Sequence, residues 1–599
     1  MFLTIGTIAI LYQQTGFRAM TGKVDQSRKW KFIARSGCAI LILAHAVLSV
    51  ISAASNSVTF DEYAHLPAGV AYWKQGWPAF AMHNLSPPLA RLVAAAPVVI
   101  AGVESPDVRP DLAHGPQNAH WDYGKTFERA NASRYQRLFV IGRLGLLPVS
   151  CLGLWLVWKW AGELYGAKSA LAAGVLWAFN PDLIAHGSLV GTDAFTAVAM
   201  LAATYLWWKF FDGHGQRKLW LILGAVAFAA AQLSKFTAMI LVPMLAVMAI
   251  CRIADRTITW RRALIGLLTC AALSWIAINA IYGFRGTFTR FSAHQFQSRP
   301  MPTLQSALPK WWPSLLPREY LRGFDIQKFE TESGVLAFVL GDAYRWSRWY
   351  YYPVALASKL PVGAIGLILL SIGFLVAKPQ AAGAGEISLL AALGVFLLLV
   401  IVLADVNIGV RYILPAYPLA IVLISRIWRD RAETVRSFWS TQRVGWALLS
   451  IMMGESLLAA PRYLSFINFA AGGQTSGWRI VNDSNFDWGQ GLLDLRRWLD
   501  AHGNPPIAMA YFGRVNPRVY GINYSPITAP GDSPLVAVST YYLNGLTHRL
   551  PTDDGATSWV SLPYARELRE IEPLDRAGPT IYIYRATDVA LAARRARNR

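Results

Sequence analysis

The chain has 599 residues, of which 54% are hydrophobic and only 15% are charged, and its formal net charge is +21. A soluble protein of average composition carries about 25% charged residues, so the composition excludes an ordinary soluble enzyme. The apolar residues form long blocks with basic residues on one side of them, so the positive charge indicates membrane topology rather than a nucleic-acid partner.

The first apolar stretch, Phe2–Tyr12, is too short to span a bilayer and has no small-residue cleavage site nearby. Met20 is an alternative start. We expect residues 1–32 to form a cytoplasmic segment and Ile33–Ala54 to form the first span. The four cysteines fall in or beside apolar blocks and show no metal-binding or disulfide spacing; they are Cys38, Cys151, Cys251 and Cys270.

The apolar blocks predict about eleven transmembrane helices within residues 33–460, since a span needs roughly 20 apolar residues. The predicted spans lie at residues 33–54, 138–158, 168–181, 192–208, 219–234, 236–251, 263–283, 353–377, 387–405, 411–427 and 443–460.

Basic residues are shared unevenly between the two sides of these spans. One side holds Lys159, Lys168, Lys209, Arg217, Lys218, Arg252, Arg256, Arg261, Arg262, Lys378, Arg426, Arg429, Arg431, Arg436 and Arg443. The short loops of the other side hold only Lys235 and Arg411. The basic side should be cytoplasmic. Residues 55–137 and 284–352 are then long outer loops, and residues 461–599 form an outer C-terminal domain.

The tail from residue 461 is not membrane-like. Ile507–Gly513, Pro534–Leu543 and Thr580–Arg585 are rich in Val, Ile and Tyr and are typical of strands. Gly489–Ala501 has the spacing of an amphipathic helix. We therefore expect a small α/β domain outside the membrane.

The first outer loop begins with Phe60-Asp61-Glu62-Tyr63-Ala64-His65, which places two carboxylates just outside a span. An acidic pair beside the bilayer costs free energy unless it is solvated, paired or used. Asp61 and Glu62 are therefore catalytic candidates, because a positioned carboxylate can take a proton from an attacking hydroxyl. A solvated loop with a helix-capping Asp explains the same pattern equally well.

A second motif follows about twenty residues later. His83, a candidate for binding the substrate, precedes Pro87 and Pro88, and these prolines can open a helix. Arg91 would then lie one turn into the helix, where a cation can bind a phosphate. An ordinary helix start gives the same pattern.

Four further charged residues lie at the outer ends of predicted spans. Asp193 begins a span, where a carboxylate also caps a helix. Lys235, Lys359 and Arg411 are cations on the side that the orientation bias leaves poor in charge. Such residues often only extend to the membrane surface, but they are also candidates for holding a phosphate group.

Taken in chain order, several motifs resemble the C-type (GT-C) glycosyltransferase superfamily, most closely its family 39 protein O-mannosyltransferases and aminoarabinose lipid A transferases. The motifs are Asp61-Glu62 with the later Pro87-Pro88-Leu89, Ala185-His186-Gly187 with Thr192-Asp193, Trp349-Tyr350-Tyr351-Tyr352-Pro353 with Lys359-Leu360-Pro361, Asn407-Ile408-Gly409-Val410-Arg411-Tyr412-Ile413-Leu414-Pro415, Asp483-Ser484-Asn485-Phe486-Asp487-Trp488-Gly489-Gln490, and Tyr511-Phe512-Gly513 with Tyr520-Gly521.

The resemblance implies a polyprenyl-phosphate sugar donor and an active site at the outer face. Carried over by motif, Asp61 is the base with Glu62 beside it, and Asp193 resembles the family's second acidic position. Arg411 is a candidate for the donor phosphate. The family often has His directly before Pro-Pro, whereas three residues intervene after His83 in this chain.

We therefore expect an all-α polytopic membrane protein with a GT-C fold and a small outer domain, located in the bacterial inner membrane. Its function would be an inverting sugar transfer from the lipid-linked donor to a protein, lipid or glycan. No cofactor is evident, although Asp and Glu suit hard cations and leave a divalent metal open. No nucleic-acid partner is expected.

Two other functions compete with this interpretation. A transporter or lipid flippase also needs many spans and buried charges, but it usually shows repeated halves. A scaffold that binds polysaccharide through its aromatic-rich outer domain is the third. The long, asymmetric outer loops favour the enzyme.

Overall fold

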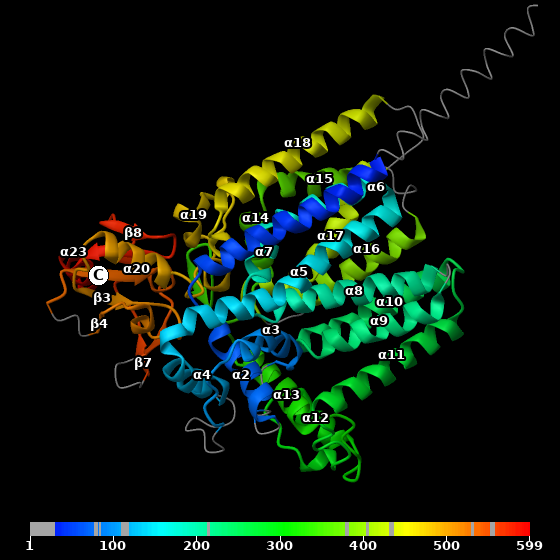
Figure 1. The fold of residues 1–599 in the computed structure, drawn as a ribbon, viewed down its shortest axis with the longest axis horizontal. Coiled ribbons are helices and arrows are strands. Elements are labelled where there is room, and N and C mark those ends of the chain that lie inside the picture. Colours follow the sequence, from blue (N-terminus) through cyan, green and yellow to red (C-terminus); the bar gives the residue numbers. More distant parts are fainter. Residues whose placement is uncertain are drawn as a thin grey trace, which may run out of the picture.

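The computed structural model describes residues 30–76, 79, 82, 86–108, 119–212, 216–377, 383–402, 406–429, 436–528, 532–551 and 557–598. In this part of the chain, long helices form a bundle, and a small sheet lies at one end of it (Figure 1). The candidate His83 lies outside the described residues.

The bundle consists of the helices that the apolar blocks predict, and each of the predicted spans overlaps a helix. The helices are Trp30–Ser55, α5 (Tyr135–Tyr165), α6 (Ala167–Ala178), α8 (Asp193–Asp212), α9 (Arg217–Gln232), α10 (Leu241–Ala254), α11 (Trp260–Ile281), α14 (Tyr351–Lys359), α15 (Val362–Ala377), α16 (Ala384–Leu397), α17 (Ala416–Ile424) and α18 (Arg436–Ala459). Among the described helices, 6 are long and apolar enough to cross a membrane, or 7 if a bent pair counts as one span. The expected polytopic helical fold is confirmed.

The bent pair is α14 and α15, which the sequence predicts as one continuous span over 353–377. The two helices meet at an angle of 118°. Leu360 between them is extended (ψ 136°), because the ring of the following Pro361 disfavours helical backbone at the preceding residue. The break leaves Lys359 at the end of α14.

The two segments predicted as long outer loops, residues 55–137 and 284–352, are largely helical where the structure describes them. The first contains α2 (Glu62–Gln75), α3 (Leu89–Ile100) and α4 (Ala119–Ala130). The second contains α12 (Pro300–Ala307), α13 (Arg318–Glu332) and the hairpin of β1 (Ala337–Val339) and β2 (Asp342–Tyr344). As the sequence predicts, Pro87 and Pro88 directly precede α3. A Cβ at Gly69 of α2 would lie 2.3 Å from the carbonyl oxygen of Arg91, so only glycine permits this approach of α2 to α3.

The C-terminal region forms a five-stranded sheet with the order β4-β3-β5-β9-β8. Its strands are β3 (Ile507–Ala510), β4 (Ser525–Pro526), β5 (Leu535–Ser539), β8 (Asp575–Ala577) and β9 (Ile581–Arg585). A second hairpin pairs β6 (His548–Pro551) with β7 (Thr557–Val560), and the helices α20 (Leu492–Ala501) and α23 (Ala586–Arg597) flank the region. The predicted strands and helix coincide with β3, β5, β9 and α20, and the small C-terminal α/β unit is confirmed.

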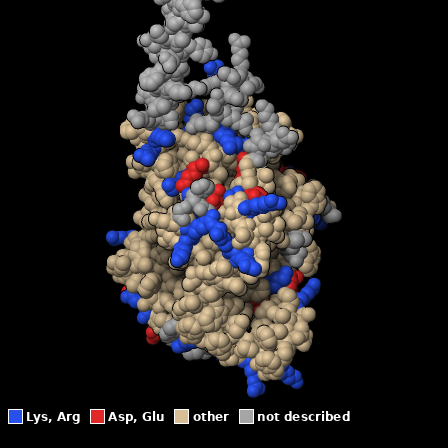
Figure 2. All heavy atoms as spheres, turned by 90° about the vertical axis from the view of Figure 1, so that its right-hand side faces the viewer, with Lys and Arg blue, Asp and Glu red and all other residues tan. Residues whose placement is uncertain are grey.

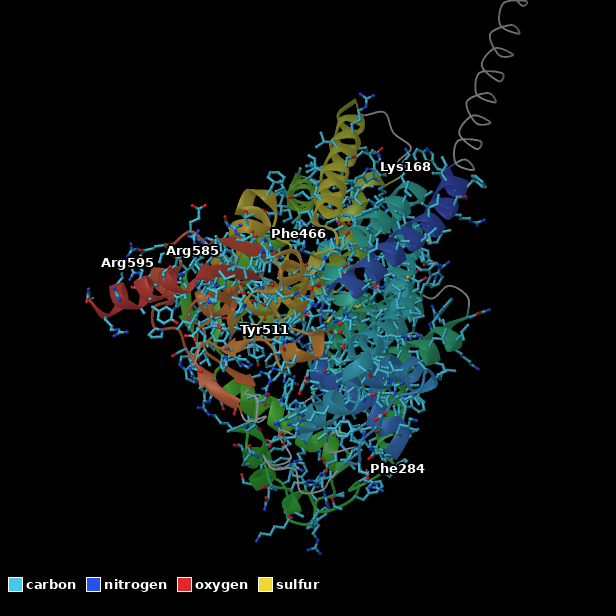
Figure 3. All side chains as sticks on the ribbon, turned by 60° about the vertical axis from the view of Figure 1, so that its left-hand side comes forward. Lys168, Phe284, Phe466, Tyr511, Arg585 and Arg595 are labelled. Carbon is cyan, nitrogen blue, oxygen red and sulfur yellow. The ribbon has the colours of Figure 1, made fainter. Side chains whose placement is uncertain are left out.

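Basic residues mark the end of the bundle that lies away from the sheet (Figure 2). Lys168 lies at one end, whereas Arg585 and Arg595 lie with the sheet at the other (Figure 3). The end away from the sheet gathers many Lys and Arg side chains (Figure 2). It includes the junction of α8 and α9, where Lys209 ends one helix and Arg217 begins the next.

A buried ion pair joins the start of α2 to α5. Glu62 and Arg143 are 1% and 0% exposed, and their side chains approach to 2.6 Å. Arg143 also donates to three backbone carbonyls within residues 53–57. Glu62 accepts hydrogen bonds from the backbone N–H groups of Thr59 and Val190. All these bonds fix the point where the chain leaves the first span.

Replacing Arg143 with Met keeps much of the side-chain length but removes the charge. The Glu62 carboxylate is then buried without its partner. We expect this change to lower the free energy of unfolding by about 3–5 kcal/mol, measured as a fall in thermal stability of the purified protein in detergent. Arg137→Met, at an exposed position of α5, is the control and should have little effect. Equal stability of the two variants would contradict a role for the pair in fixing the fold.

Candidate active site

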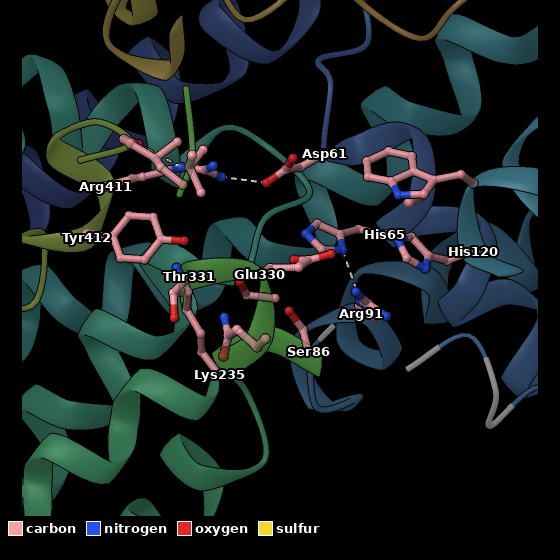
Figure 4. A pocket seen from close by; sticks show the side chains of 16 residues that line it. Asp61, His65, Ser86, Arg91, His120, Lys235, Glu330, Thr331, Arg411 and Tyr412 are labelled. Carbon is pink, nitrogen blue, oxygen red and sulfur yellow. Dashed lines mark hydrogen bonds and ion pairs between the residues drawn. The ribbon is translucent and has the colours of Figure 1, made fainter. Parts of the chain in front are cut away.

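A cavity of about 220 Å³ lies between α2, α3, α4, α13 and the turn that precedes α17 (Figure 4). Its polar and charged lining residues are Asp61, His65, Ser86, Arg91, His120, Thr192, Lys235, Gln327, Glu330, Thr331, Arg411 and Tyr412. The fold thus brings together Asp61, Arg91 and Arg411, which are far apart in the sequence.

Asp61 and Arg411 form an ion pair across the cavity. The distance from Arg411 Nη1 to Asp61 Oδ2 is 2.5 Å, and the side chains are 10% and 25% exposed. The indole ring of Trp488 lies 4.5 Å from the Arg411 guanidinium carbon. This contact supports one face of the planar guanidinium and leaves its edge directed toward the carboxylate.

A second ion pair, between Lys235 and Asp193, lies beside the first. Asp193 Oδ2 is also 4.0 Å from Arg411 Nη1, and Lys235 Nζ lies 4.2 Å from the centre of the Tyr412 ring. Asp193 begins α8, as the sequence predicts, and it links the two cations. Lys235 lines the cavity, whereas Asp193 lies behind it.

Neutral histidines form another part of the wall. Arg91 Nε donates to His65 Nδ1 at 2.9 Å and its Nη1 donates to the carbonyl of Met82 at 2.7 Å. Burial and the neighbouring Arg91 hold the pKa of His65 well below its usual range. His65 therefore carries its proton on Nε2. The pKa of His120 is lowered well below its usual range by the same two causes.

Glu330 of α13 also points into the cavity that Asp61 faces (Figure 4). Desolvation, followed by the nearby Asp61 carboxylate, raises the pKa of Glu330 to about 7. The sequence interpretation misses this residue because it treats residues 284–352 as a loop. The signal available is the helical spacing of Gln327, Glu330 and Thr331, which share one face of α13.

Besides Asp193, two further predicted site residues do not line the cavity. Glu62 is turned away from it toward Arg143. Lys359 is 1% exposed and pairs with Asp182 at 3.2 Å, and its ammonium also donates to the carbonyl of Asn485 at 2.8 Å. Lys359 thus connects α14 to the segment that carries Trp488.

That segment, residues 483–490, also fixes the backbone just before Arg411. Asn485 Oδ1 accepts a hydrogen bond from the Val410 N–H at 2.9 Å, and Ser484 Oγ donates to the carbonyl of Ile408 at 2.7 Å. A Cβ at Gly409 would lie 2.3 Å from Ser484 Oγ, and the φ of Gly409 is +94°. Only glycine therefore fits at this contact.

Asp483 belongs to the same segment. Its burial raises its pKa to about 6, although Arg411 acts in the opposite direction. Across the described residues, no three His, Cys, Asp or Glu side chains gather in a way that could hold a metal ion.

Several solved structures align with the chain at low sequence identity. ArnT from Cupriavidus metallidurans, solved in the apo state, aligns at 10% identity over 93% of this chain and 99% of its own, with a TM-score of 0.44. The oligosaccharyltransferase of Archaeoglobus fulgidus in its apo form aligns at 9% identity over 89% and 74%, with a TM-score of 0.46. The protein O-mannosyltransferase Pmt1-Pmt2 complex of S. cerevisiae aligns at 17% identity over 42% and 32%, with a TM-score of 0.29.

No curated protein matches the chain by sequence. Residues 141–278 match the model of the dolichyl-phosphate-mannose-protein mannosyltransferase family. The matched stretch runs from α5 to α11 and includes Asp193 and Lys235 of the site. The match confirms the resemblance to the protein O-mannosyltransferase family over this stretch, which is less than half of the chain.

Proposed function

We propose that this chain transfers a sugar from a polyprenyl-phosphate donor to an acceptor at the outer face of a bacterial inner membrane. The matched family takes its name from mannosyl transfer to protein from dolichyl phosphate, a donor of this chemical class. The observation that carries the proposal is the Asp61–Arg411 pair. It places a carboxylate that can accept a proton beside a cation that can bind a phosphate.

The donor phosphate binds to Arg411 and Lys235 in this proposal. A guanidinium presents two parallel N–H groups to phosphate oxygens, and an ammonium adds a point charge. Asp193 contacts both cations and positions them. These cations also stabilise the charge that develops on the departing phosphate.

The reaction is an inverting displacement. Asp61 removes the proton from the acceptor hydroxyl or amine as that atom bonds to the anomeric carbon. The bond from the anomeric carbon to the phosphate oxygen breaks, and its electron pair stays on the phosphate. Glu62 does not touch the reactants. It positions Asp61 through its bonds to Arg143 and the adjacent backbone.

We expect the cavity to face outward because α2 and α4, which contribute to its lining, lie on the side of the bundle near the sheet (Figure 1), whereas the opposite end gathers Lys and Arg side chains (Figure 2). The positive-inside bias assigns the basic end to the cytoplasm. The acceptor, whether protein, lipid or glycan, would therefore be modified outside the cytoplasm.

The orientation is tested by single cysteines in a variant that lacks the four native ones. Arg595→Cys, at an exposed position of α23, should react with a membrane-impermeant maleimide added to spheroplasts. Lys168→Cys, at the opposite end (Figure 3), should react only after the membrane is permeabilised. The reverse pattern would place the cavity on the cytoplasmic side and contradict the proposed orientation.

Asp61→Asn is nearly isosteric but cannot take the acceptor proton. We expect sugar transfer to fall by at least about 10²-fold, the lower range of a general-base contribution, while donor binding persists. Transfer from a labelled polyprenyl-phosphate sugar by purified protein measures the effect. Asp107→Asn changes an exposed carboxylate of the same outer segment and should keep full activity. Full activity of Asp61→Asn would remove Asp61 from the mechanism.

Arg411→Lys keeps the positive charge but loses the forked donor pair and the planar contact with Trp488. We expect the affinity for polyprenyl phosphate to fall roughly tenfold or more, since one charge-assisted hydrogen bond contributes about 1.5–3 kcal/mol. Equilibrium binding of the lipid phosphate measures this change. Arg479→Lys, exposed in the tail, is the control. An unchanged affinity would show that Arg411 only anchors the chain before α17.

A further inference from the structure

The helix α13 presents a polar face to the cavity that the proposed reaction does not yet use. Gln327, Glu330 and Thr331 are spaced so that they project from one side of the helix, and all three line the cavity. Glu332 lies on the other side, where it pairs with Lys328 at 3.6 Å. The helix therefore separates a cavity face from a face turned away from it.

The position of α13 is fixed by contacts outside the cavity. Tyr320 is buried against Phe236, with ring centres 5.1 Å apart. Asp325 accepts hydrogen bonds from the backbone N–H groups of Gln297 and Ser298 at 2.8 and 3.0 Å. The helix that carries the cavity face is thus held in place by the fold before any substrate binds.

Glu330 differs from the other cavity carboxylates because it lacks a protein partner. Asp61 pairs with Arg411 and Asp193 pairs with Lys235. Within the described residues, the Glu330 carboxylate makes no hydrogen bond or ion pair. Its side chain is open to the cavity. Its oxygens are therefore accessible to a ligand that enters the cavity.

The group that suits this face is a set of sugar hydroxyls. A carboxylate repels the donor phosphate, which would bind the cations instead. Because a single bond joins the sugar to that phosphate, the sugar would lie close to the cations and within the same cavity. A carboxylate can accept hydrogen bonds from two neighbouring hydroxyls, and an amide or hydroxyl can both donate and accept. The cavity face of α13 offers one of each type within a helical turn.

We propose that the cavity face of α13, residues Gln327, Glu330 and Thr331, binds ring hydroxyls of the transferred sugar, and that Glu330 is the main determinant of which sugar is accepted. This inference rests on the proposed sugar transfer. The lipid phosphate and the sugar are then recognised by different elements: by Arg411 and Lys235 on one side, and by α13 on the other.

The variant Glu330→Gln tests this division. The amide keeps the shape but loses the charge-assisted bonds to hydroxyls, so we expect kcat/KM for the sugar-loaded donor to fall by roughly 10- to 100-fold. The affinity for polyprenyl phosphate without a sugar should stay within about twofold of wild type. Glu332→Gln, on the opposite face of the same helix, is the matched control and should change neither quantity.

Deoxy analogues of the sugar that the wild type uses best identify the contact. Removing the hydroxyl that binds Glu330 should lower wild-type kcat/KM strongly and that of Glu330→Gln much less. Equal penalties in both proteins for every deoxy analogue would overturn the proposal. A loss confined to the KM of the acceptor, or a selective loss with amino sugars only, would also overturn it, since the contact would then be to the acceptor or to an ammonium group.

Failure of the broader function is distinguishable from failure of this inference. If wild type neither binds polyprenyl phosphate nor transfers any sugar from it, the proposed function is wrong. If wild type does both, Arg411→Lys weakens lipid-phosphate binding, and Glu330→Gln behaves as Glu332→Gln, then only the role of α13 is wrong.

Discussion

The buried pair of Glu62 and Arg143 determines where the chain turns from the first span into α2. Removing two charges from water often costs more free energy than their attraction returns, so such a pair is weak as a source of net stability. Its effect here is positional, because the same guanidinium also holds the backbone of residues 53–57. Asp61 precedes Glu62 in the chain, so its place opposite Arg411 follows from this pair.

The tail completes the site from the other side. Trp488 lies against the guanidinium of Arg411, and Asn485 binds the turn that carries it. Lys359 ties this segment to the membrane helices through α14. The long side chain of Arg411 has many rotamers. The contacts from the tail are therefore needed to keep its guanidinium in one position. The C-terminal region therefore holds in place Arg411, one of the residues that line the cavity.

Apolar block length predicts the helices well because the bilayer requires about the same length of each span. The motifs also identify Asp61, Asp193 and Arg411 as site candidates, because these charged residues lie beside apolar sequence. Glu330 could not be found in this way. It lies in a polar helix where charges are ordinary, and only the docking of α13 through Tyr320 turns its face inward.

In the proposed reaction, charge balance within the cavity would couple donor binding to the release of Asp61 from Arg411. Arg411 is neutralised by Asp61 and Lys235 by Asp193. An entering lipid phosphate adds negative charge, and Arg411 cannot fully satisfy both anions with the same Nη1 group. We therefore expect the phosphate to displace Asp61, because an uncompensated extra anion in a recessed site is costly. The carboxylate becomes free to accept a proton only once the donor is in place, which orders donor binding before attack by the acceptor.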